Sequence, residues 1–396
     1  FNMFWYTHNL FLIFTVVFMI HGAQSWLEPT QAVWFTAPGF AVYLLGRINR
    51  MFEVDGKVEI VRAETYDNTT ILWTRKPRWN KFRFATAGSY ALVNIPEIAK
   101  YEWHPFTISS APSDELLRFH IRNAGDWTGQ LWKYVREMES KSTLKFKRPG
   151  LERVETLNPS RLASLIGKGD SPEESMFPIS KKINLPFSHI RIHGPNGAPT
   201  QDYLRYERVV LVGAGIGVTP FASILREVMA KWRSKKCECC GHINHSVHET
   251  AMLQRVQSHW VTREQAELSW FAPELSELAS MDSGGRLEIH QHITGMSGKG
   301  TETSRRLVEA VQRVAHEKES HDIISGVRGA KQLTHFGRPD WRAYLAKIAQ
   351  DFQGKRIGVF YCGPRGLEKV IRKVCRELSV SSSQTKVKFV FSHENF

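Results

Sequence analysis

Cysteine is scarce in this sequence. The 396 residues include five cysteines, all in the second half of the chain, and three of them lie between Cys237 and Cys240. An even, regularly spaced set of cysteines is absent, which excludes a small secreted scaffold held together by disulfides. The cysteine pattern fits a reducing compartment such as the cytosol.

Acidic residues are few compared with basic ones. Lys and Arg number 53 and Asp and Glu 39, which gives a formal net charge of +14. The cations are scattered, and no basic helix with interleaved aromatic residues stands out, so nucleic acid is not an expected partner. A solvated surface beside an anionic lipid leaflet accounts for this charge.

Formal charge is absent from residues 1–20, and this absence points to a membrane. The stretch is long enough to cross a bilayer as a helix. Its polar residues are Asn2, Thr7, His8, Asn9 and Thr15. A second apolar stretch covers residues 32–45 and ends before Arg47 and Arg50, as expected at a cytosolic exit. A signal peptide is the alternative for residues 1–20, but a basic leader and a clear cleavage site are lacking.

Three regions are therefore expected. Residues 1–51 are predicted to form two transmembrane helices, with earlier helices preceding Phe1. Residues 52–205 show short alternating runs separated by Gly, Pro and Asn, which predict an antiparallel β-barrel with an insertion at about 140–185. Strands are expected at 58–64, 70–75, 90–95, 106–109, 116–122 and 189–193, and a helix at 129–139.

From residue 206 onward, apolar strands alternate with helices. Strands are expected at 209–212, 259–261, 287–294, 356–361 and 387–391, and helices at 219–232, 264–281 and 367–378. This alternation predicts an α/β domain at 206–396 with a mostly parallel sheet. Weak patterns at 234–257 and 296–322 indicate loops or insertions.

A glycine-rich loop closes the first of these strands and opens the next helix. Glycines in this place let the backbone approach a diphosphate at a helix N-terminus. The spacing differs from that of the ordinary dehydrogenase fingerprint. The candidate residues are Gly213, Gly215, Ile216, Gly217, Val218, Thr219 and Pro220.

A second candidate nucleotide site lies in the barrel region. A strand bracketed by Pro105 and Pro112 offers hydroxyl and backbone N–H groups, and an arginine and a glycine-led helix start follow it, both suited to a pyrophosphate. An ordinary strand and turn is the alternative. The candidates are His104, Pro105, Phe106, Thr107, Ile108, Ser109, Ser110, Arg122, Gly125 and Thr128.

Several residues near the C-terminus complete the pattern. Arg263 follows a strand, where a cation can meet the 2′-phosphate of NADPH, and Arg338 offers a second cation. Cys362, Gly363 and Pro364 end another strand at the ligand-binding edge, although Cys362 also reads as a buried small apolar residue. Phe396 ends the chain directly after a strand, where a frayed polar tail is the norm.

Two groups of possible metal ligands remain. His8 and His21 lie about 20 Å apart along one apolar helix, a separation that suits two stacked haems, with interfacial histidines as the alternative. The segment from Cys237 to His248 contains zinc-type donors but lacks a second cysteine pair, so a reduced loop is the alternative.

Taken together, these motifs resemble the dehydrogenase module of the NADPH oxidase family. The resemblance rests on the strings at His104–Thr107, 213–220, Cys362–Pro364 and the terminal Glu394-Asn395-Phe396, with the strings around Arg338 and Phe391 closest to the dual-oxidase branch. His8 and His21 match the family's fifth transmembrane helix. The resemblance implies a C-terminal portion whose reductase module is similar to ferredoxin-NADP reductase.

The resemblance also implies roles for the candidates. Residues 104–110, Arg122 and the start of the helix after it would bind FAD; residues 213–220, Arg263, Arg338 and Cys362–Pro364 would bind NADPH. His8 and His21 would ligate two b-type haems, whose partner histidines are not in this sequence. Phe396 would cover the flavin and give way to nicotinamide, and Cys362 would stand beside the reacting atoms.

The implied reaction takes electrons from cytosolic NADPH through FAD and haem to dioxygen, releasing superoxide or hydrogen peroxide. The expected setting is a multi-pass protein of the plasma membrane, with cytosolic reductase domains, the missing transmembrane helices and regulatory subunits or a calcium-binding module as partners. A ferric-chelate reductase and a non-catalytic membrane scaffold are the alternatives.

Overall fold

A computed structural model describes residues 2–23, 31–53, 57–77, 85–100, 102–144, 189–234, 253–282, 285–295, 332–352, 356–381 and 387–394. Most of the expected insertion at 140–185, the donor cluster at 237–248 and the predicted gate residue Phe396 lie outside these residues. The chain divides into two compact units, 1–56 and 57–396.

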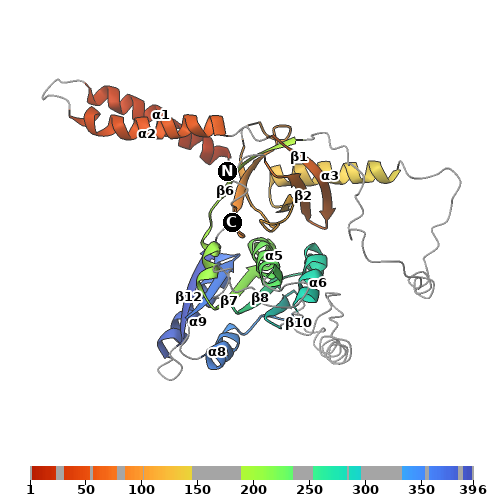
Figure 1. Ribbon diagram of the computed structural model, residues 1–396. Helices are drawn as coiled ribbons and strands as arrows, with labels where there is room; N and C mark the ends of the chain where they lie inside the picture. The colour runs from red at the N-terminus through yellow and green to blue at the C-terminus, as the bar shows by residue number, and fades with distance from the viewer. Residues whose placement is uncertain are drawn as a thin grey trace. The chain divides into compact units, whose positions relative to one another are not determined.

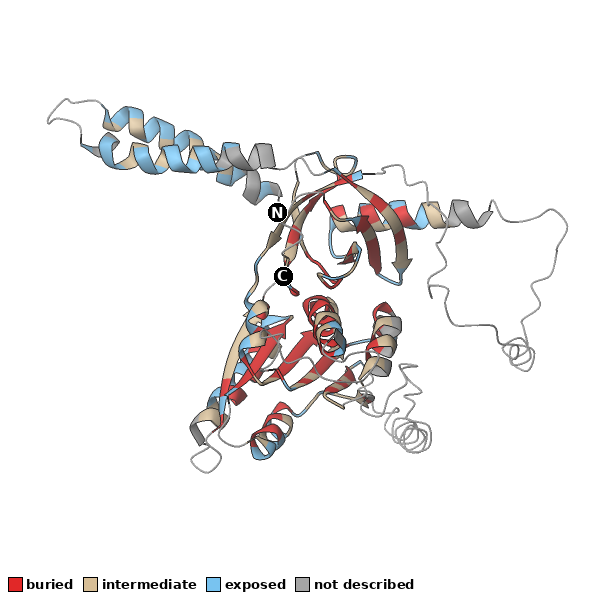
Figure 2. Cartoon of the chain, in the orientation of Figure 1, coloured by how far each residue is buried: buried red, intermediate tan, exposed pale blue. Residues whose placement is uncertain are grey.

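The first unit is a pair of helices, α1 (Asn2–Gly22) and α2 (Ala32–Glu53), as Figure 1 shows. The prediction of two helices here is confirmed. None of their described residues is buried, and these helices are pale blue and tan in Figure 2. Trp34 and Phe35, for example, are 80% and 82% exposed.

The structure corrects the prediction that these two helices are transmembrane spans. Among the residues it describes, no helix has both the length and the apolar character that a bilayer crossing needs. Thr7, His8 and Asn9 interrupt the apolar sequence of α1, and the apolar stretch of α2 measures only about 21 Å before its first arginine, against a hydrocarbon core of about 30 Å.

The second unit begins with an antiparallel sheet. Its strand order is β4-β3-β6-β1-β2-β5. The strands are β1 (Lys57–Tyr66), β2 (Thr69–Arg75), β3 (Tyr90–Asn94), β4 (His104–Thr107), β5 (Leu116–Arg122) and β6 (His189–Asn196). An isolated antiparallel bridge between Ile108, just after β4, and Phe119 on β5 joins the two edges. The sheet therefore curls into the predicted barrel.

One helix covers this sheet. The predicted helix at 129–139 is longer in the structure, α3 (Asp126–Leu144). Trp127, Leu131 and Val135 recur every four residues and are buried in the core of the sheet, which is the spacing of one helix face. A 3-10 helix, η2 (Pro199–Arg205), leads toward the next sheet.

The second sheet is parallel throughout, in the order β10-β9-β8-β7-β11-β12. Its strands are β7 (Arg208–Ala214), β8 (Arg255–Thr262), β9 (Leu287–Ile293), β10 (Gln332–Phe336), β11 (Arg356–Cys362) and β12 (Lys388–Glu394). The strands β8, β9 and β10 are added in turn on one side of β7, and β11 and β12 are added on its other side. The order reverses between β7 and β11, and a crevice for ligands is expected at their carboxyl ends.

Helices cover both faces of the parallel sheet (Figure 1). Side chains from α5 (Thr219–Ser234) and α6 (Ala272–Met281) join one core, and those from α8 (Trp341–Asp351) and α9 (Arg365–Ser381) join another. The buried residues, red in Figure 2, follow the strands and the inner faces of these helices. The predicted sheet and its helices at 219–232 and 367–378 are confirmed.

Two parts of this unit differ from the expectation. The single helix predicted at 264–281 is a 3-10 helix, η5 (Gln265–Trp270), followed by α6. The chain leaves helical geometry at Phe271, whose φ and ψ are −128° and 7°, two residues before Pro273, which has no N–H to donate. The strand β10 and the helix α8 were not predicted.

Candidate functional site

The glycine-rich loop fixes the backbone at the reversal point of the parallel sheet. A Cβ added at Gly213 would lie 2.7 Å from the Cα of Val218, and one added at Gly217 would lie 2.3 Å from the carbonyl oxygen of Cys362. Gly215 has φ of +56°, which side chains disfavour. Only glycine fits these positions, so the loop and the start of α5 form a bare backbone cradle suited to a diphosphate.

Cys362 ends β11, the strand next to β7, and lies directly beside this loop. It pairs with Gly213 in the register of β11 and β7, and only 1% of its surface is exposed. Burial, with a smaller effect of the Glu394 carboxylate, raises the pKa of the Cys362 thiol. Cys362 is therefore a neutral thiol at pH 7 and not a nucleophilic thiolate.

A pocket of about 790 Å³ opens at the carboxyl edge of the parallel sheet. Three arginines line it: Arg122 at the end of β5, Arg263 directly after β8 and Arg338 after β10. Gly215 and Pro364 also line it. The structure thus brings five of the predicted residues to one cavity. Three guanidinium groups beside a glycine loop suit an anionic ligand that carries phosphates.

The predicted barrel strand lies apart from this pocket. His104 packs against Trp127 with ring centroids 4.6 Å apart, and Phe106 lies 5.7 Å from the same ring. Thr107, Ile108, Ser109 and Ser110 are buried, while Pro105 is exposed. None of these residues lines the three-arginine pocket.

The two serines of this strand are bonded within the sheet. The hydroxyl of Ser109 donates to the carbonyl oxygen of Arg118 at 3.0 Å and lies 2.8 Å from Nδ1 of His120. The hydroxyl of Ser110 accepts from the N–H of Arg118 at 3.1 Å. These hydroxyls hold strand 104–107 and its extension against β5.

The start of α3 is capped by its own side chain. The hydroxyl of Thr128 accepts from the N–H groups of Ala124 and Gly125, both at 3.0 Å, and donates to the carbonyl oxygen of Gly125 at 3.1 Å. A Cβ added at Gly125 would meet nothing within 4 Å. The turn before α3 is therefore ordered and open to an approaching ligand.

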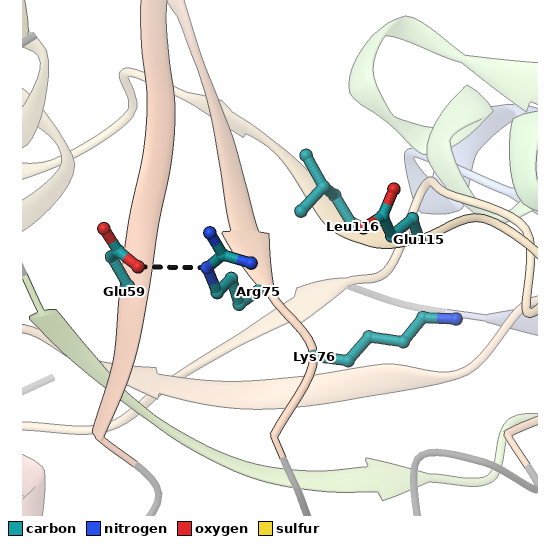
Figure 3. Close-up of a pocket in the computed structure, with 5 residues that line it drawn as sticks. All are labelled: Glu59, Arg75, Lys76, Glu115 and Leu116. Carbon is teal, nitrogen blue, oxygen red and sulfur yellow. Dashed lines mark hydrogen bonds and ion pairs between the residues drawn. The ribbon is translucent and has the colours of Figure 1, made fainter. Parts of the chain in front are cut away.

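A smaller cavity of about 550 Å³ lies at the end of the antiparallel sheet and contains none of the predicted residues. Figure 3 shows its lining side chains, Glu59, Arg75, Lys76, Glu115 and Leu116. Nε of Arg75 lies 3.0 Å from the carboxylate of Glu59, and the ammonium of Lys76 donates to the carbonyl oxygen of Pro112 at 2.7 Å. Opposite charges pair in this cavity, so we assign the candidate site to the three-arginine pocket.

Comparison with known proteins adds the family. The FAD-binding domain family matches residues 56–200, and the ferric reductase NAD binding domain family matches residues 206–376. The chain is 35% identical over 403 residues to respiratory burst oxidase homolog protein B of Solanum tuberosum and 34% identical over 405 residues to protein D of Arabidopsis thaliana. Both alignments cover 100% of this chain. The chain is similar along its whole length to these respiratory burst oxidase homologues.

The match covers only part of these NADPH oxidase relatives. The chain spans 42% of the Solanum protein and 40% of the Arabidopsis protein. Among solved structures, a ferredoxin NADP+ reductase from Neisseria gonorrhoeae with bound FAD and NADP aligns over 85% of this chain and 97% of its own. Its TM-score is 0.46 and its sequence identity to this chain is 11%.

Sequence reasoning gave no role to Glu394, a buried carboxylate that does not line the three-arginine pocket. The carboxylate is buried at the end of β12 and accepts from the N–H and the hydroxyl of Thr200, at 2.9 and 2.5 Å. Burial raises the pKa of Glu394. An acid that ends a strand of the parallel sheet was the available signal, because a buried carboxylate needs partners.

A group of four histidines on the parallel sheet was also missed. His259, His290, His292 and His335 lie on one face of the parallel sheet, and their ring centroids are 5.1, 5.9, 5.8 and 6.3 Å from that of Tyr344 on α8. In the described part of the chain, no group of three or more His, Cys, Asp or Glu is arranged to hold a metal ion. We call these four residues the histidine cluster.

Trp341 joins the histidine cluster to the pocket. It lines the pocket and lies 5.5 Å from the ring of His259 and 6.2 Å from that of His292. Burial, and then the charges of His335 and His290, lower the pKa of His292 to about 2. Burial also lowers the pKa of His259. Both imidazoles are therefore neutral at pH 7, and their rings stack with centroids 5.6 Å apart.

His8 and His21 lie on α1, in the other unit, and both are exposed. The ring of His8 stacks on Phe11 with centroids 6.5 Å apart. Thirteen residues separate the two histidines, so their Cα atoms lie on different sides of the helix. Their imidazoles have the donor chemistry of axial haem ligands.

Proposed function

We propose that this chain is the reductase portion of an NADPH oxidase, in which cytosolic NADPH supplies electrons that leave the protein on dioxygen. The observation that carries the proposal is the pocket in which Arg122, Arg263 and Arg338 meet the glycine loop. The assignment is supported by two domain families, one FAD-binding and one NAD-binding, on consecutive parts of the chain.

In this proposal the parallel-sheet residues bind and orient NADPH. The loop at 213–218 and the N-terminus of α5 hold the diphosphate, since glycines let the backbone approach such a group at a helix N-terminus. Arg263 and Arg338 hold the 2′-phosphate. Cys362 and Gly363 lie at the reversal point of the sheet, where the neutral thiol would add no charge near the nicotinamide.

The barrel residues hold FAD. The half-buried rings of His104 and Phe106, which pack on the buried Trp127, suit a flat ring. Arg122 with the turn before α3 suits the pyrophosphate. When bound, FAD supplies the conversion of a two-electron hydride donor into a source of single electrons. We propose domains at 52–205 and 206–396, between which η2 ends and β7 begins.

The remaining steps concern the helical unit. We propose that His8 and His21 each provide one axial ligand to a b-type haem and that superoxide or hydrogen peroxide is the product. The partner ligands and the bilayer-spanning helices would come from the rest of a multi-pass membrane protein, with the reductase domains in the cytosol. His8→Leu and His21→Leu in the full-length protein should each remove one haem from the reduced spectrum and leave dye reduction by NADPH intact.

The decisive experiment is the reduction of an artificial acceptor by the FAD-loaded chain with NADPH or NADH. Arg263→Ala should raise KM for NADPH about 10- to 100-fold, because a charge-assisted hydrogen bond contributes about 1.5–3 kcal/mol, and leave KM for NADH nearly unchanged. Arg376→Ala, at an exposed arginine of α9 that does not line the pocket, is the matched control. Equal use of both nucleotides by the wild-type chain would sink the proposal.

A ferric-chelate reductase is the second candidate, because the domain family at 206–376 is described as a ferric reductase NAD binding domain. The full-length protein should reduce dioxygen in preference to a ferric chelate if the oxidase proposal holds. A non-catalytic scaffold is opposed by the intact glycine loop, and a flavin absorbance spectrum of the purified protein tests it directly.

A further inference from the structure

One acidic side chain lies among the three arginines of the pocket. Glu267, in the 3-10 helix η5 that follows β8, lines the same cavity as Arg122, Arg263 and Arg338. It is half-buried, whereas Glu264, one turn earlier on the same segment, is exposed and does not line the pocket. A carboxylate is unexpected in this cavity, because its other charged lining residues are arginines that attract anionic ligands.

The contacts of Glu267 tie it to Arg263. Its carboxylate oxygen Oε2 accepts from the backbone N–H of Arg263 at 3.4 Å. Among the described residues no ion pair neutralises this carboxylate. Burial raises the pKa of Glu267, and the charge of Arg122 opposes that rise. The carboxylate is thus held beside the backbone of Arg263, the residue to which we assign the binding of the 2′-phosphate.

The chemistry of that position distinguishes the two nicotinamide nucleotides. An acidic residue beyond the second strand of such a sheet accepts a hydrogen bond from a free ribose 2′-hydroxyl, as in NADH, whereas a cation there suits a 2′-phosphate. This chain has both kinds of residue in one pocket. The carboxylate repels the phosphate and offsets part of the attraction of the arginines.

We propose that Glu267 is a specificity-determining residue that lowers the affinity for NADPH and narrows the preference for NADPH over NADH. This inference rests on the proposed function, since it needs the nucleotide to bind with its 2′-phosphate at Arg263. With no nucleotide bound, the Glu267 carboxylate is the negative charge that faces the arginines of the pocket. A 2′-phosphate that enters must share the guanidinium groups with it.

The test uses the full chain and two soluble probes, 2′,5′-ADP and 5′-AMP, which differ only in the 2′-phosphate. Glu267→Gln removes the charge and keeps the shape, and Glu264→Gln removes an equal charge outside the pocket. Calorimetry should show that Glu267→Gln binds 2′,5′-ADP about three- to tenfold more tightly than the wild type, and more so at low ionic strength. Its affinity for 5′-AMP should stay equal or fall.

The controls separate this inference from the proposed function. Glu264→Gln should change both affinities less than twofold, since an exposed charge is screened by solvent. A wild-type chain that prefers 2′,5′-ADP, combined with a Glu267→Gln variant equal to Glu264→Gln or weaker than the wild type, overturns the inference alone. A wild-type chain without that preference overturns the proposed NADPH site as well. The ratio of kcat/KM for NADPH and NADH should move in the same direction as the probe affinities.

Discussion

The two sheets of residues 57–396 use their side chains in different ways. In the antiparallel sheet the predicted site residues lie on a strand, and the hydroxyls of Ser109 and Ser110 are bonded to β5. In the parallel sheet β7 and β11 are almost wholly buried, and the predicted residues lie beyond their carboxyl ends. The predicted ligand-binding residues therefore lie on a strand in the antiparallel sheet and at the carboxyl edge in the parallel sheet.

This difference sets what each region tolerates. At the parallel edge two backbone segments approach so closely that a single methyl group would overlap with Cys362. The open turn before α3 meets no such limit at Gly125. We expect substitutions at the parallel edge to be severe and local, and those in the barrel to act through the hydrogen bonds that hold its strands.

The largest effect is expected where the two sheets join. Arg118 on β5 pairs with Glu274 on α6, and their side chains are only 12% and 15% exposed. Glu274→Ala leaves a buried guanidinium without its partner and should lower the free energy of unfolding by about 3–5 kcal/mol. Urea unfolding of the full chain measures this loss.

A paired replacement is the control for that loss. The double variant Arg118→Met with Glu274→Leu removes both charges and should recover most of the lost stability, because apolar pairs of similar volume replace buried ion pairs well. A double variant as unstable as the single one would mean that the two sheets are joined by packing and not by this pair.

The second prediction concerns the close approach of Gly217 to Cys362 at the carboxyl edge of the parallel sheet. Gly217→Ala should cost about 1–3 kcal/mol in unfolding free energy, because its Cβ would lie 2.3 Å from the carbonyl oxygen of Cys362. Gly366→Ala, where nothing lies within 4 Å, should cost nothing. Thermal unfolding of the two variants compares them, and equal melting temperatures would contradict the close approach.

A pH effect distinguishes the histidine cluster of the parallel sheet. Burial lowers the pKa of His292 to about 2, while the unfolded chain binds this proton near pH 6.5. Protons therefore favour the unfolded state, and stability should fall as the pH drops below about 6.5. At pH 5.5 the loss due to His292 should be about 1.4 kcal/mol.

Urea unfolding at pH 7.5 and pH 5.5 measures this dependence. His292→Gln should reduce it by about 1.4 kcal/mol, while the buried His259 keeps its own contribution. His189→Gln, at an exposed histidine of β6, should leave the dependence unchanged. A wild-type chain with equal stability at the two values of pH would contradict the neutral, buried state of His259 and His292.

Sequence patterns found the parts of this fold that local chemistry dictates. The glycine loop, the strand before it and Cys362 were recognisable because steric limits and apolar runs are local. Glu267 was missed because a predicted continuous helix at 264–281 hid the 3-10 segment that turns it into the pocket. The histidine cluster depends on the register that pairs His259 with His290 and His335 with His292. The sequence of one strand does not determine its register against a strand that is distant in the chain.

The smallest effect should come from the cavity at the end of the antiparallel sheet (Figure 3). Arg75 and Glu59 pair there at 3.0 Å, but their side chains are 64% and 40% exposed. Solvent screens such a pair, so Arg75→Met and Glu59→Gln should each change the free energy of unfolding by less than about 1 kcal/mol. Both variants should bind 2′,5′-ADP like the wild type, whereas Arg263→Ala should not. If Arg75→Met weakened nucleotide binding as much as Arg263→Ala, the ligand would lie on the antiparallel sheet and the contrast between a binding face and a binding edge would have to be reversed.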